Sequence, residues 1–146
     1  MTKGVYLGPL GCWLLVEQSG EMVSRICFSN NAPDEPSVLA AKIADYLIGR
    51  APCPKAELDL SRLTDFERRI SAIVQDIPRG ETATYGEVAK RAGRPGAARA
   101  VGQVMAKNPF AILVPCHRVV SRKDLGGFAW GPELKERLLA LERGPP

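Results

Sequence analysis

The chain has 146 residues, of which 45% are hydrophobic and 25% charged, and its formal net charge is +4. This length is enough for one good core, or for two small lobes that share an interface. No apolar stretch approaches the roughly 20 residues of a membrane-spanning helix, and the N-terminus lacks the basic-then-apolar pattern of a secretion signal. We therefore expect a soluble, cytoplasmic protein with no membrane partner, whose cysteines stay mostly free in a reducing compartment.

The first 60 residues predict a small sheet followed by one helix. After a loop over 30–36, apolar residues recur at helical spacing from Leu39 to Leu47, which predicts an amphipathic helix ending at Gly49. The proline-containing stretch 51–60 is expected to link two lobes. Short runs of apolar and β-branched residues, separated by glycine-containing turns, predict three antiparallel strands, at 4–7, 12–17 and 22–28.

The second part of the chain predicts helices. Capping-box sequences begin one helix at Thr64 and a shorter one at Thr84, which stops at Gly93. A tight turn then leads into a helix over about 97–107, so that these two helices have the outline of a helix-turn-helix. Pro132 begins a last helix, which is closed by Gly144, with a stripe formed by Leu134, Leu138 and Leu141.

These elements predict a mixed α/β (α+β) fold in two domains. Residues 1–55 would form an N-terminal scaffold, a small antiparallel sheet with a helix. Residues 56–146 would form a helical C-terminal domain that contains the helix-turn-helix and the reactive site described below.

Positive charge is concentrated between residues 79 and 123. This segment holds nine Lys or Arg and two acids, a net charge of +7 that leaves −3 for the remainder. A basic segment suits a polyanionic partner, because neutralising phosphates with Lys and Arg releases counterions. A solvated basic surface without a ligand would give the same count, so charge alone leaves both interpretations open.

One face of the expected helix over 97–107 is unusually bare. Its buried stripe would be formed by Ala97, Val101, Val104 and Met105, and small residues dominate the other side, where Arg99 and Gln103 project. A face of this kind permits close approach to a narrow nucleic-acid groove, whereas a bulky recognition helix suits the wide major groove. Tight packing against another helix is the alternative.

The candidate nucleophile is Cys116, which precedes the only histidine, His117, in the sequence Val-Pro-Cys-His-Arg. A thiol attacks as its thiolate, and a free thiol with a pKa of roughly 8.5 is mostly protonated at neutral pH. An adjacent imidazole can accept that proton, directly or through one water, so Cys-His pairs recur in nucleophilic catalysis.

The other cysteines are Cys12, Cys27 and Cys53, which we expect to be buried small residues rather than metal ligands. No histidine precedes His117, so we expect no metal site of cysteines and histidines in the N-terminal part. Cys12 and Cys27 lie on neighbouring expected strands and could form a disulfide.

Two motifs together resemble the O6-alkylguanine-DNA alkyltransferase family, whose members remove alkyl groups from guanine O6. They are Pro115-Cys116-His117-Arg118 and Ala97-Ala98-Arg99-Ala100-Val101-Gly102, with Asn108-Pro109 between them. The resemblance runs from Gly80 to Val120 and resumes at Gly126, whereas residues 1 to about 55 resemble the family only in outline. It implies an RNase H-like N-terminal domain, a winged-helix-like C-terminal domain and no cofactor.

The resemblance implies a reaction on a guanine that has been rotated out of the duplex by a helix-turn-helix in the minor groove. The Cys116 thiolate would attack the alkyl carbon, His117 would take the thiol proton through a water, and Glu142 would hold the imidazole. Tyr85 would crowd the phosphate of the target nucleotide and protonate guanine N3. Asn108 would brace the turn before the cysteine.

The same resemblance assigns Arg99 to the space left in the stack by the extruded base. Backbone groups of Cys116, Val119, Phe128 and Ala129 would read the guanine edges, and Met105 would contact the base secondarily. The other DNA-contacting positions are the small or polar ones on the same helix, namely Ala97, Ala98, Ala100, Gly102 and Gln103.

Each assignment has a structural alternative. Tyr85 could be a half-buried aromatic residue of a short helix, and Glu142 a surface acid like Glu136. Asn108 could simply cap the chain before Pro109, which is compatible with bracing the turn. Met105 could be ordinary core.

The chain departs from the family at the pocket loop, where many members carry a Tyr-Ser pair followed by two glycines. Phe128 keeps an aromatic wall without its hydroxyl, and Ala129 keeps a backbone N–H but offers no side-chain donor. Trp130 could line the entrance or belong to the core. Ala111 stands where some members have a proline, so the sequence leaves the preference for bulky or methyl adducts open.

We expect stoichiometric, irreversible transfer of an alkyl group to Cys116 from O6-alkylguanine, with O4-alkylthymine as a possible further lesion. The partner would be double-stranded DNA, bound by a monomer associated with the nucleoid. The alternatives are a non-catalytic lesion-binding protein of the same fold and an unrelated Cys-His hydrolase, which would need an oxyanion hole.

Overall fold

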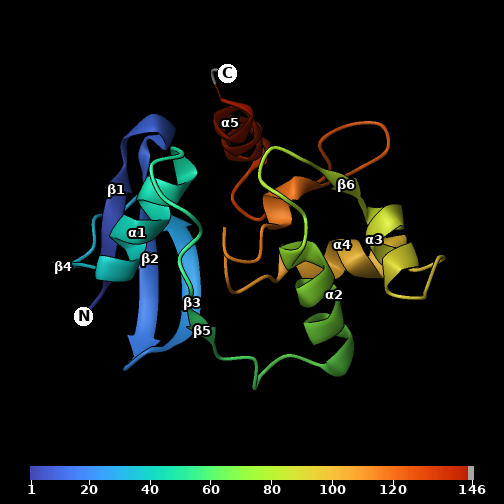
Figure 1. The fold of residues 1–146 in the computed structure, drawn as a ribbon, viewed down its shortest axis with the longest axis horizontal. Helices are drawn as coiled ribbons and strands as arrows, with labels where there is room; N and C mark the ends of the chain where they lie inside the picture. Colours follow the sequence, from blue (N-terminus) through green and yellow to red (C-terminus); the bar gives the residue numbers. More distant parts are fainter. Residues whose placement is uncertain (145–146) are drawn as a thin grey trace.

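The computed structural model describes residues 1–144, which form seven short strands and five α-helices (Figure 1). Four strands precede the first helix, and the other three lie between helices. The strands are β1 (Lys3–Leu7), β2 (Cys12–Ser19), β3 (Met22–Ser29), β4 (Glu35–Pro36), β5 (Glu57–Leu58), β6 (Ala83–Thr84) and β7 (Val119–Val120). The helices are α1 (Val38–Leu47), α2 (Asp65–Gln75), α3 (Tyr85–Arg91), α4 (Ala98–Ala106) and α5 (Pro132–Arg143). Short 3₁₀ helices occupy Gly8–Leu10 and Cys116–Arg118. The mixed α/β fold expected from the sequence is confirmed.

The N-terminal sheet has the order β4-β1-β2-β3-β5, with β1, β2 and β3 antiparallel as predicted. Its two edges differ from the prediction, because β4 pairs in parallel with β1 and β5 in parallel with β3. These strands come from stretches read as a loop and a linker. A strand of two residues shows no alternation of apolar and polar positions, so the sequence carries no signal for it.

Alternate residues of β2 and β3 bury one face of the sheet against α1, whose Ala40, Ile43 and Leu47 are buried. Ser37 caps that helix by accepting a hydrogen bond from the Ala40 N–H.

Cys12 lies on the buried face with Leu14, whereas Cys27 lies on the opposite face from Ile26 and Phe28. Both thiols are therefore free, and the disulfide considered above is not formed. Cys53 is exposed rather than buried, which corrects that expectation.

The two parts of the chain are joined by backbone hydrogen bonds. The N–H of Ile26 donates to the carbonyl of Pro109 at 2.8 Å, and the N–H of Ala111 donates to the carbonyl of Ile26 at 3.1 Å. Phe110, between those two partners, is fully buried. The segment before Cys116 is thus fixed to the edge of the N-terminal sheet, and the proposed division at residue 55 stays a prediction.

The C-terminal helices follow the sequence signals closely. Thr64 and Thr84 both form complete capping boxes, with Glu67 and Glu87 as the reciprocal partners. Helices α3 and α4 pack together as the predicted helix-turn-helix, and β6 and β7 form a two-stranded parallel sheet beside them.

Helix α5 differs from the prediction in the stripe that it buries. The buried residues are Lys135, Leu138, Leu139 and Glu142, whereas Leu134 and Leu141 are half-exposed. These four residues still recur at helical spacing, but two of them are charged. Within residues 1–144, no helix is long and apolar enough to cross a membrane.

Candidate active site

Cys116 begins the 3₁₀ turn that follows a tight reversal of the chain at residues 110–114. The carbonyl of Phe110 accepts from the N–H of Val114 at 2.9 Å, and Ile112 adopts a φ of +73° at the apex. A positive φ is strained for a β-branched residue, so surrounding contacts must hold this turn.

Asn108 supplies two of those contacts. Its side-chain amide donates to the carbonyl of Val114 at 2.8 Å, and its oxygen accepts from the N–H of Phe110 at 3.0 Å. The side chain therefore spans both ends of the reversal, in the position expected of a brace. A cap before Pro109 would have required only one of these hydrogen bonds.

Cys116 is only 3% exposed, yet it lines a cavity of about 160 Å³. The other residues around this cavity come from the helix-turn-helix and from the loop before α5: Tyr85, Gly102, Met105, Ala106, Gly127, Phe128 and Ala129. The sequence-predicted nucleophile, the bare helix and the pocket loop are thus brought together around one enclosed space.

His117 follows Cys116 and is fully buried against α5. Its Nε2 lies 3.0 Å from Oε1 of Glu142, within hydrogen-bond distance although the ring N–H does not point straight at that oxygen. With Nε2 facing the carboxylate, Nδ1 is assigned as the nitrogen free to accept a proton. Burial lowers the pKa of His117, which keeps the imidazole neutral, and the hydrogen bond to Glu142 opposes that shift.

Arg118 is a site residue that the sequence analysis missed, since it was counted with the basic surface. It is 3% exposed, and its guanidinium pairs with both carboxylate oxygens of Glu142. It also donates to the carbonyl of Ile77 and to the hydroxyl of Tyr46, each at 2.7 Å. Tyr46 belongs to α1, so the N-terminal part of the molecule contributes to holding Glu142.

The pKa of Glu142 reflects this environment. Burial by itself raises the pKa of a carboxyl group, but the hydrogen bonds from Arg118 and His117 outweigh it and lower the pKa to about 2. Glu142 is therefore ionised throughout the physiological range, and it is not the surface acid that was the alternative.

Lys135 is the second missed residue. Its side chain is completely buried, and its ammonium donates to the carbonyls of Val119 at 2.6 Å and Gly127 at 2.9 Å. Burial lowers its pKa from 10.5 to about 8, an effect that a negative charge on Cys116 opposes. Its spacing in the sequence could have indicated this burial. Lys135 precedes Leu138 by three positions and Glu142 by seven, so all three lie on the same face of α5.

Opposing effects act on the Cys116 thiol. Burial raises its pKa, whereas the hydrogen bond with Asn108, the charge of Lys135 and the backbone N–H groups of the 3₁₀ turn lower it. Burial prevails, so the thiol stays protonated until a base removes its proton.

Tyr85 begins α3 and forms one wall of the cavity. Its hydroxyl accepts from the N–H of Gly127 at 3.2 Å, and its ring lies 5.9 Å from the ammonium of Lys135. Gly126 has a φ of +72°, and a side-chain carbon there would lie 2.6 Å from the Tyr85 hydroxyl. Only glycine permits this close approach. Burial raises the pKa of Tyr85 above its usual value of 10, so the phenol keeps its proton.

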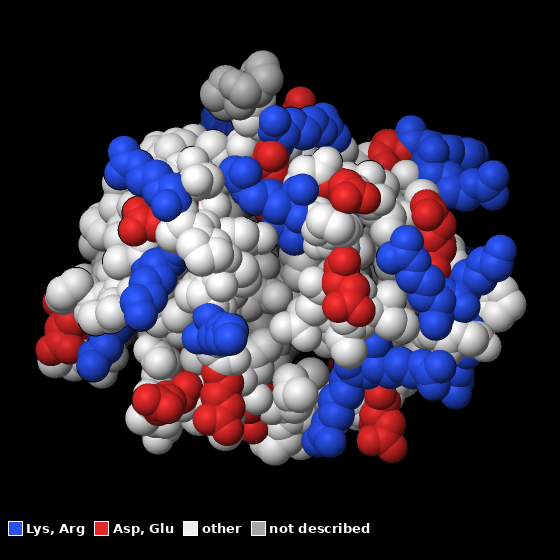
Figure 2. Space-filling model, in the orientation of Figure 1, with Lys and Arg blue, Asp and Glu red and all other residues white. Residues whose placement is uncertain are grey.

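Helix α4 presents the bare face that its sequence predicted. Val101 and Met105 are buried, Arg99 and Gln103 are exposed, and Gly102 lies against the ring of Tyr85. Ala97, Ala98 and Ala100 are half-exposed along the first turn. Figure 2 shows Lys and Arg side chains gathered over the α3–α4 part of the surface.

Two residues counted in the basic segment do not belong to that surface. Arg118 is buried in its ion pair, and Arg79 is half-buried and donates to the carbonyls of Leu47 and Leu141. The net charge of the segment therefore overstates what a ligand would meet.

The pocket loop is fixed by an aromatic cluster. Trp130 packs edge-on against Phe28 of β3 at 5.2 Å and against Phe128 at 5.3 Å between ring centres. Trp130 is half-buried in this cluster and does not line the cavity at Cys116, so neither role considered from the sequence describes it fully; it lines a second cavity described below. Val119 lies behind the wall, with its side chain buried and its carbonyl engaged by Lys135. Its predicted contact with guanine would have to use the second lone pair of that carbonyl.

The chain is similar to known proteins in both sequence and fold. The family model of the 6-O-methylguanine DNA methyltransferase DNA-binding domain matches residues 65–144, more than half of the chain. The chain belongs to this family. The resemblance stated from the sequence motifs is thereby confirmed, and both motifs lie within the matched segment.

Solved structures of family members share the complete fold. Mycobacterium tuberculosis OGT, solved in complex with DNA, superposes with a TM-score of 0.84 at 35% identity, covering 97% of this chain and 92% of that one. The O6-methylguanine-DNA methyltransferase of Pyrococcus kodakaraensis gives a TM-score of 0.81 at 29% identity, covering 97% and 99%.

Curated relatives in the family carry the name methylated-DNA–protein-cysteine methyltransferase. That of Mycolicibacterium paratuberculosis is 48% identical over 103 residues, which are 70% of this chain and 62% of the relative. One from Saccharomyces cerevisiae is 39% identical over 115 residues, 75% of this chain and 61% of the relative. The matched part of the chain thus spans somewhat less than two thirds of these relatives.

The carboxylate of Glu142 generates a prediction about stability and pH. Its pKa in the folded protein lies below the usual 4.5, so its contribution to stability is complete above about pH 4.5 and is lost as the pH falls toward 2. In Glu142→Gln the buried Arg118 loses its counter-charge. We expect the free energy of unfolding at pH 7 to fall by about 3 to 5 kcal/mol, and its decline between pH 4.5 and 2 to become shallower. Urea titrations across this range measure both, with Glu136→Gln on the exposed face of α5 as control.

The charge of Lys135 generates a second prediction. In Lys135→Met the thiolate of Cys116 loses the positive charge that lowers its pKa, and we expect the pKa of that thiol to rise. The measurement is the pH dependence of iodoacetamide labelling, followed on the peptide that contains Cys116. Lys123→Met, an exposed lysine nearby in sequence, should leave the profile in place. An unshifted profile in Lys135→Met would contradict the electrostatic role.

Proposed function

We propose that this protein is a DNA-repair methyltransferase that transfers the alkyl group of O6-alkylguanine irreversibly to its own Cys116. The reaction joins the alkyl carbon to Sγ and breaks its bond to O6, so that the bonding electrons return to the guanine. The products are a thioether on Cys116 and an unmodified guanine. No thiol exchange reverses a thioether, so each chain reacts once and needs no cofactor.

Activation of the thiol falls to His117. Nδ1 would take the thiol proton through one water while Glu142 stabilises the imidazolium that forms, and Arg118 keeps the carboxylate in place. Lys135 would stabilise the thiolate at the moment when it forms. A base is needed here because burial raises the pKa of the thiol, so that its deprotonation depends on His117 being in position.

The leaving base would receive its proton at N3 from Tyr85. The raised pKa of the phenol keeps the proton available, and its position on the cavity wall places it beside a base that enters the cavity. Asn108 would maintain the reversal that aims Sγ into the same space. These roles, and guanine contacts by Met105, Phe128 and Ala129, are part of the proposal.

The partner would be double-stranded DNA, approached from the minor groove. The half-exposed alanines of α4 and Gly102 allow the helix to come close to a narrow groove, and exposed Arg99 would fill the gap left by the rotated nucleotide. Ala97, Ala98, Ala100 and Gln103 would contact the backbone and groove. We propose that the protein acts as a monomer in the cytoplasm, at the nucleoid.

One observation carries this proposal: a cysteine with a buried His-Glu pair opens onto an enclosed cavity that the helix-turn-helix itself helps to line. A pure lesion-binding protein of the same fold would need no such base. A hydrolase would need donors for an oxyanion, and among the side chains that line the cavity only those of Cys116 and Tyr85 carry one.

The direct test incubates the protein with a duplex that contains one O6-methylguanine. We expect the intact mass to rise by one methyl group per chain, on the peptide that contains Cys116, with no second turnover. Cys116→Ala should gain no mass and still bind the duplex. Binding without any mass change in the unaltered protein would favour the lesion-binding alternative, and turnover of an ester would favour the hydrolase.

Arg99 generates a separate prediction about extrusion. Arg99→Ala should slow repair of the lesion in duplex DNA by tenfold or more, since unstacking a base costs a few kcal/mol. Its reaction with free O6-benzylguanine should change by less than threefold, because the free base needs no extrusion. Rates are measured in single-turnover quench experiments, with Arg122→Ala as the exposed control. Equal losses on both substrates would remove Arg99 from this role.

A further inference from the structure

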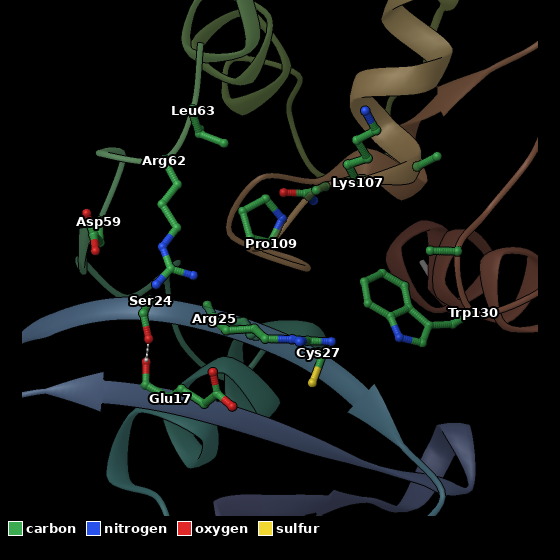
Figure 3. A pocket seen from close by; sticks show the side chains of 14 residues that line it. Glu17, Ser24, Arg25, Cys27, Asp59, Arg62, Leu63, Lys107, Pro109 and Trp130 are labelled. Carbon is green, nitrogen blue, oxygen red and sulfur yellow. Dashed lines mark hydrogen bonds between the residues drawn. The ribbon is translucent and has the colours of Figure 1, made fainter.

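A second and larger cavity, of about 680 Å³, lies beside the one at Cys116 (Figure 3). Strands β2 and β3 form one side and residues 59–63 another, while the end of α4 with residues 107–109 and the pocket loop close the remainder. We call this space the interlobe groove. Asn108, Pro109 and Ala129 form part of its wall, but no step proposed above places a ligand in it.

The interlobe groove adjoins the cavity at Cys116. Ala106 and Ala129 line both spaces, so two of the smallest side chains stand at the boundary. Asn108 lies in the groove wall, and its side chain also braces the reversal that precedes Cys116. A group that passed between the two alanines would enter the groove.

The walls on both sides of these alanines are held in place by contacts. The hydrogen bonds between Ile26 and residues 109 and 111 fix the sheet edge to the chain that follows α4. On the other side, Trp130 is held by its edge-on contacts with Phe28 and Phe128. Both walls of the groove are thus fixed by contacts within the fold.

The charged residues of the groove are unevenly distributed. Arg25, Arg62 and Lys107 are exposed cations, and none of them lies within 4.0 Å of a carboxylate oxygen in the described part of the chain. Figure 3 shows the acids Glu17 and Asp59 on the side away from Trp130, whereas the guanidinium of Arg25 extends toward Cys27 and Trp130. The end nearest the reactive cavity is therefore aromatic and cationic.

In the proposed reaction, the part of a long O6 substituent beyond its first carbon needs a space of its own. The first carbon of an O6 substituent must lie at Sγ, and the remainder must lie elsewhere, because the cavity of about 160 Å³ also has to receive the guanine. A methyl substituent consists of the reacting carbon alone and needs no further space. For a longer substituent, the adjoining space is the interlobe groove beyond Ala106 and Ala129.

We propose that the interlobe groove receives the distal part of long O6 substituents, and that Arg25 favours those that end in an anion. This rests on the proposed function. The chemistry at sulfur is unchanged: the S–C bond forms, the C–O6 bond breaks, and the tail remains on Cys116 within the groove. A guanidinium binds a carboxylate through two parallel, charge-assisted hydrogen bonds, and Trp130 offers a flat apolar surface to the linking ring.

The test compares three lesions in one duplex: O6-methylguanine, O6-(4-carboxybenzyl)guanine and its neutral analogue O6-(4-carbamoylbenzyl)guanine. The last two have nearly the same shape and differ in charge. We expect the unaltered protein to repair the carboxylate about fivefold faster than the amide, as one partly exposed charge contact allows. Arg25→Gln should reduce that ratio to about one while leaving methyl repair within twofold.

A charge reversal sharpens the experiment. Arg25→Glu should prefer O6-(4-aminomethylbenzyl)guanine, a cationic tail, over the carboxylate. Arg50→Gln, an exposed arginine outside the groove, should behave as the unaltered protein on every lesion. The rate of methyl repair reports in each case that the variant is folded.

Equal repair of the carboxylate and the amide by the unaltered protein, or an unchanged ratio in Arg25→Gln, would overturn this inference while methyl repair persists. Loss of affinity of Arg25→Gln for undamaged duplex would also overturn it, since the groove would then hold a DNA phosphate. Absence of methyl transfer in the unaltered protein would instead refute the proposed function.

Discussion

The arrangement at Cys116 depends on one buried carboxylate. Glu142 contacts the imidazole of His117 on one side and the guanidinium of Arg118 on the other, and Arg118 in turn reaches Tyr46 in α1 and the chain after α2. A buried ion pair is stabilising only when its remaining hydrogen-bond groups are satisfied. Here the extra partners of Arg118 meet that condition, so the position of the base is tied to three separate parts of the fold.

The surroundings of Cys116 keep its thiol unreactive until a base removes the proton, and they then stabilise the thiolate. Burial keeps Cys116 protonated and nearly inaccessible, which limits reaction with oxidants and stray alkylating agents. Lys135 and the 3₁₀ turn supply positive charge and N–H groups that become favourable only when the thiolate forms. A nucleophile that becomes reactive only beside its base and its substrate would suit the single-turnover reaction proposed above.

The N-terminal part contributes more than support. It supplies Tyr46 to the network of Glu142, Phe28 to the aromatic cluster that holds the pocket loop, and Ile26 to the backbone junction before Cys116. It also forms one side of the interlobe groove. The sequence of this part resembles the family only in outline, and the inference about the interlobe groove would give it a role in the choice of O6 substituents.

Local signals in the sequence were sufficient for much of this protein. Capping boxes, turns and periodicity gave the three central strands, the five helices and the helix-turn-helix, because each signal acts over a few neighbouring residues. The contiguous motif around Cys116 and His117 predicted the reactive pair, and the structure places both beside the cavity and Glu142. The bare face of α4 was visible for the same reason, since residues three and four apart share one side of a helix.

Only the tertiary structure could place Arg118 and Lys135. Both are charged residues that would ordinarily lie in water, and their burial depends on acceptors far away in the chain: Glu142 and Tyr46 for the first, Val119 and Gly127 for the second. The short parallel edge strands, the separation of Cys12 from Cys27 and the interlobe groove likewise arise from the meeting of distant segments. Sequence determined the elements and the nucleophile, whereas the electrostatic environment of that nucleophile was fixed by packing, because the free energy of a buried charge depends on every partner within reach.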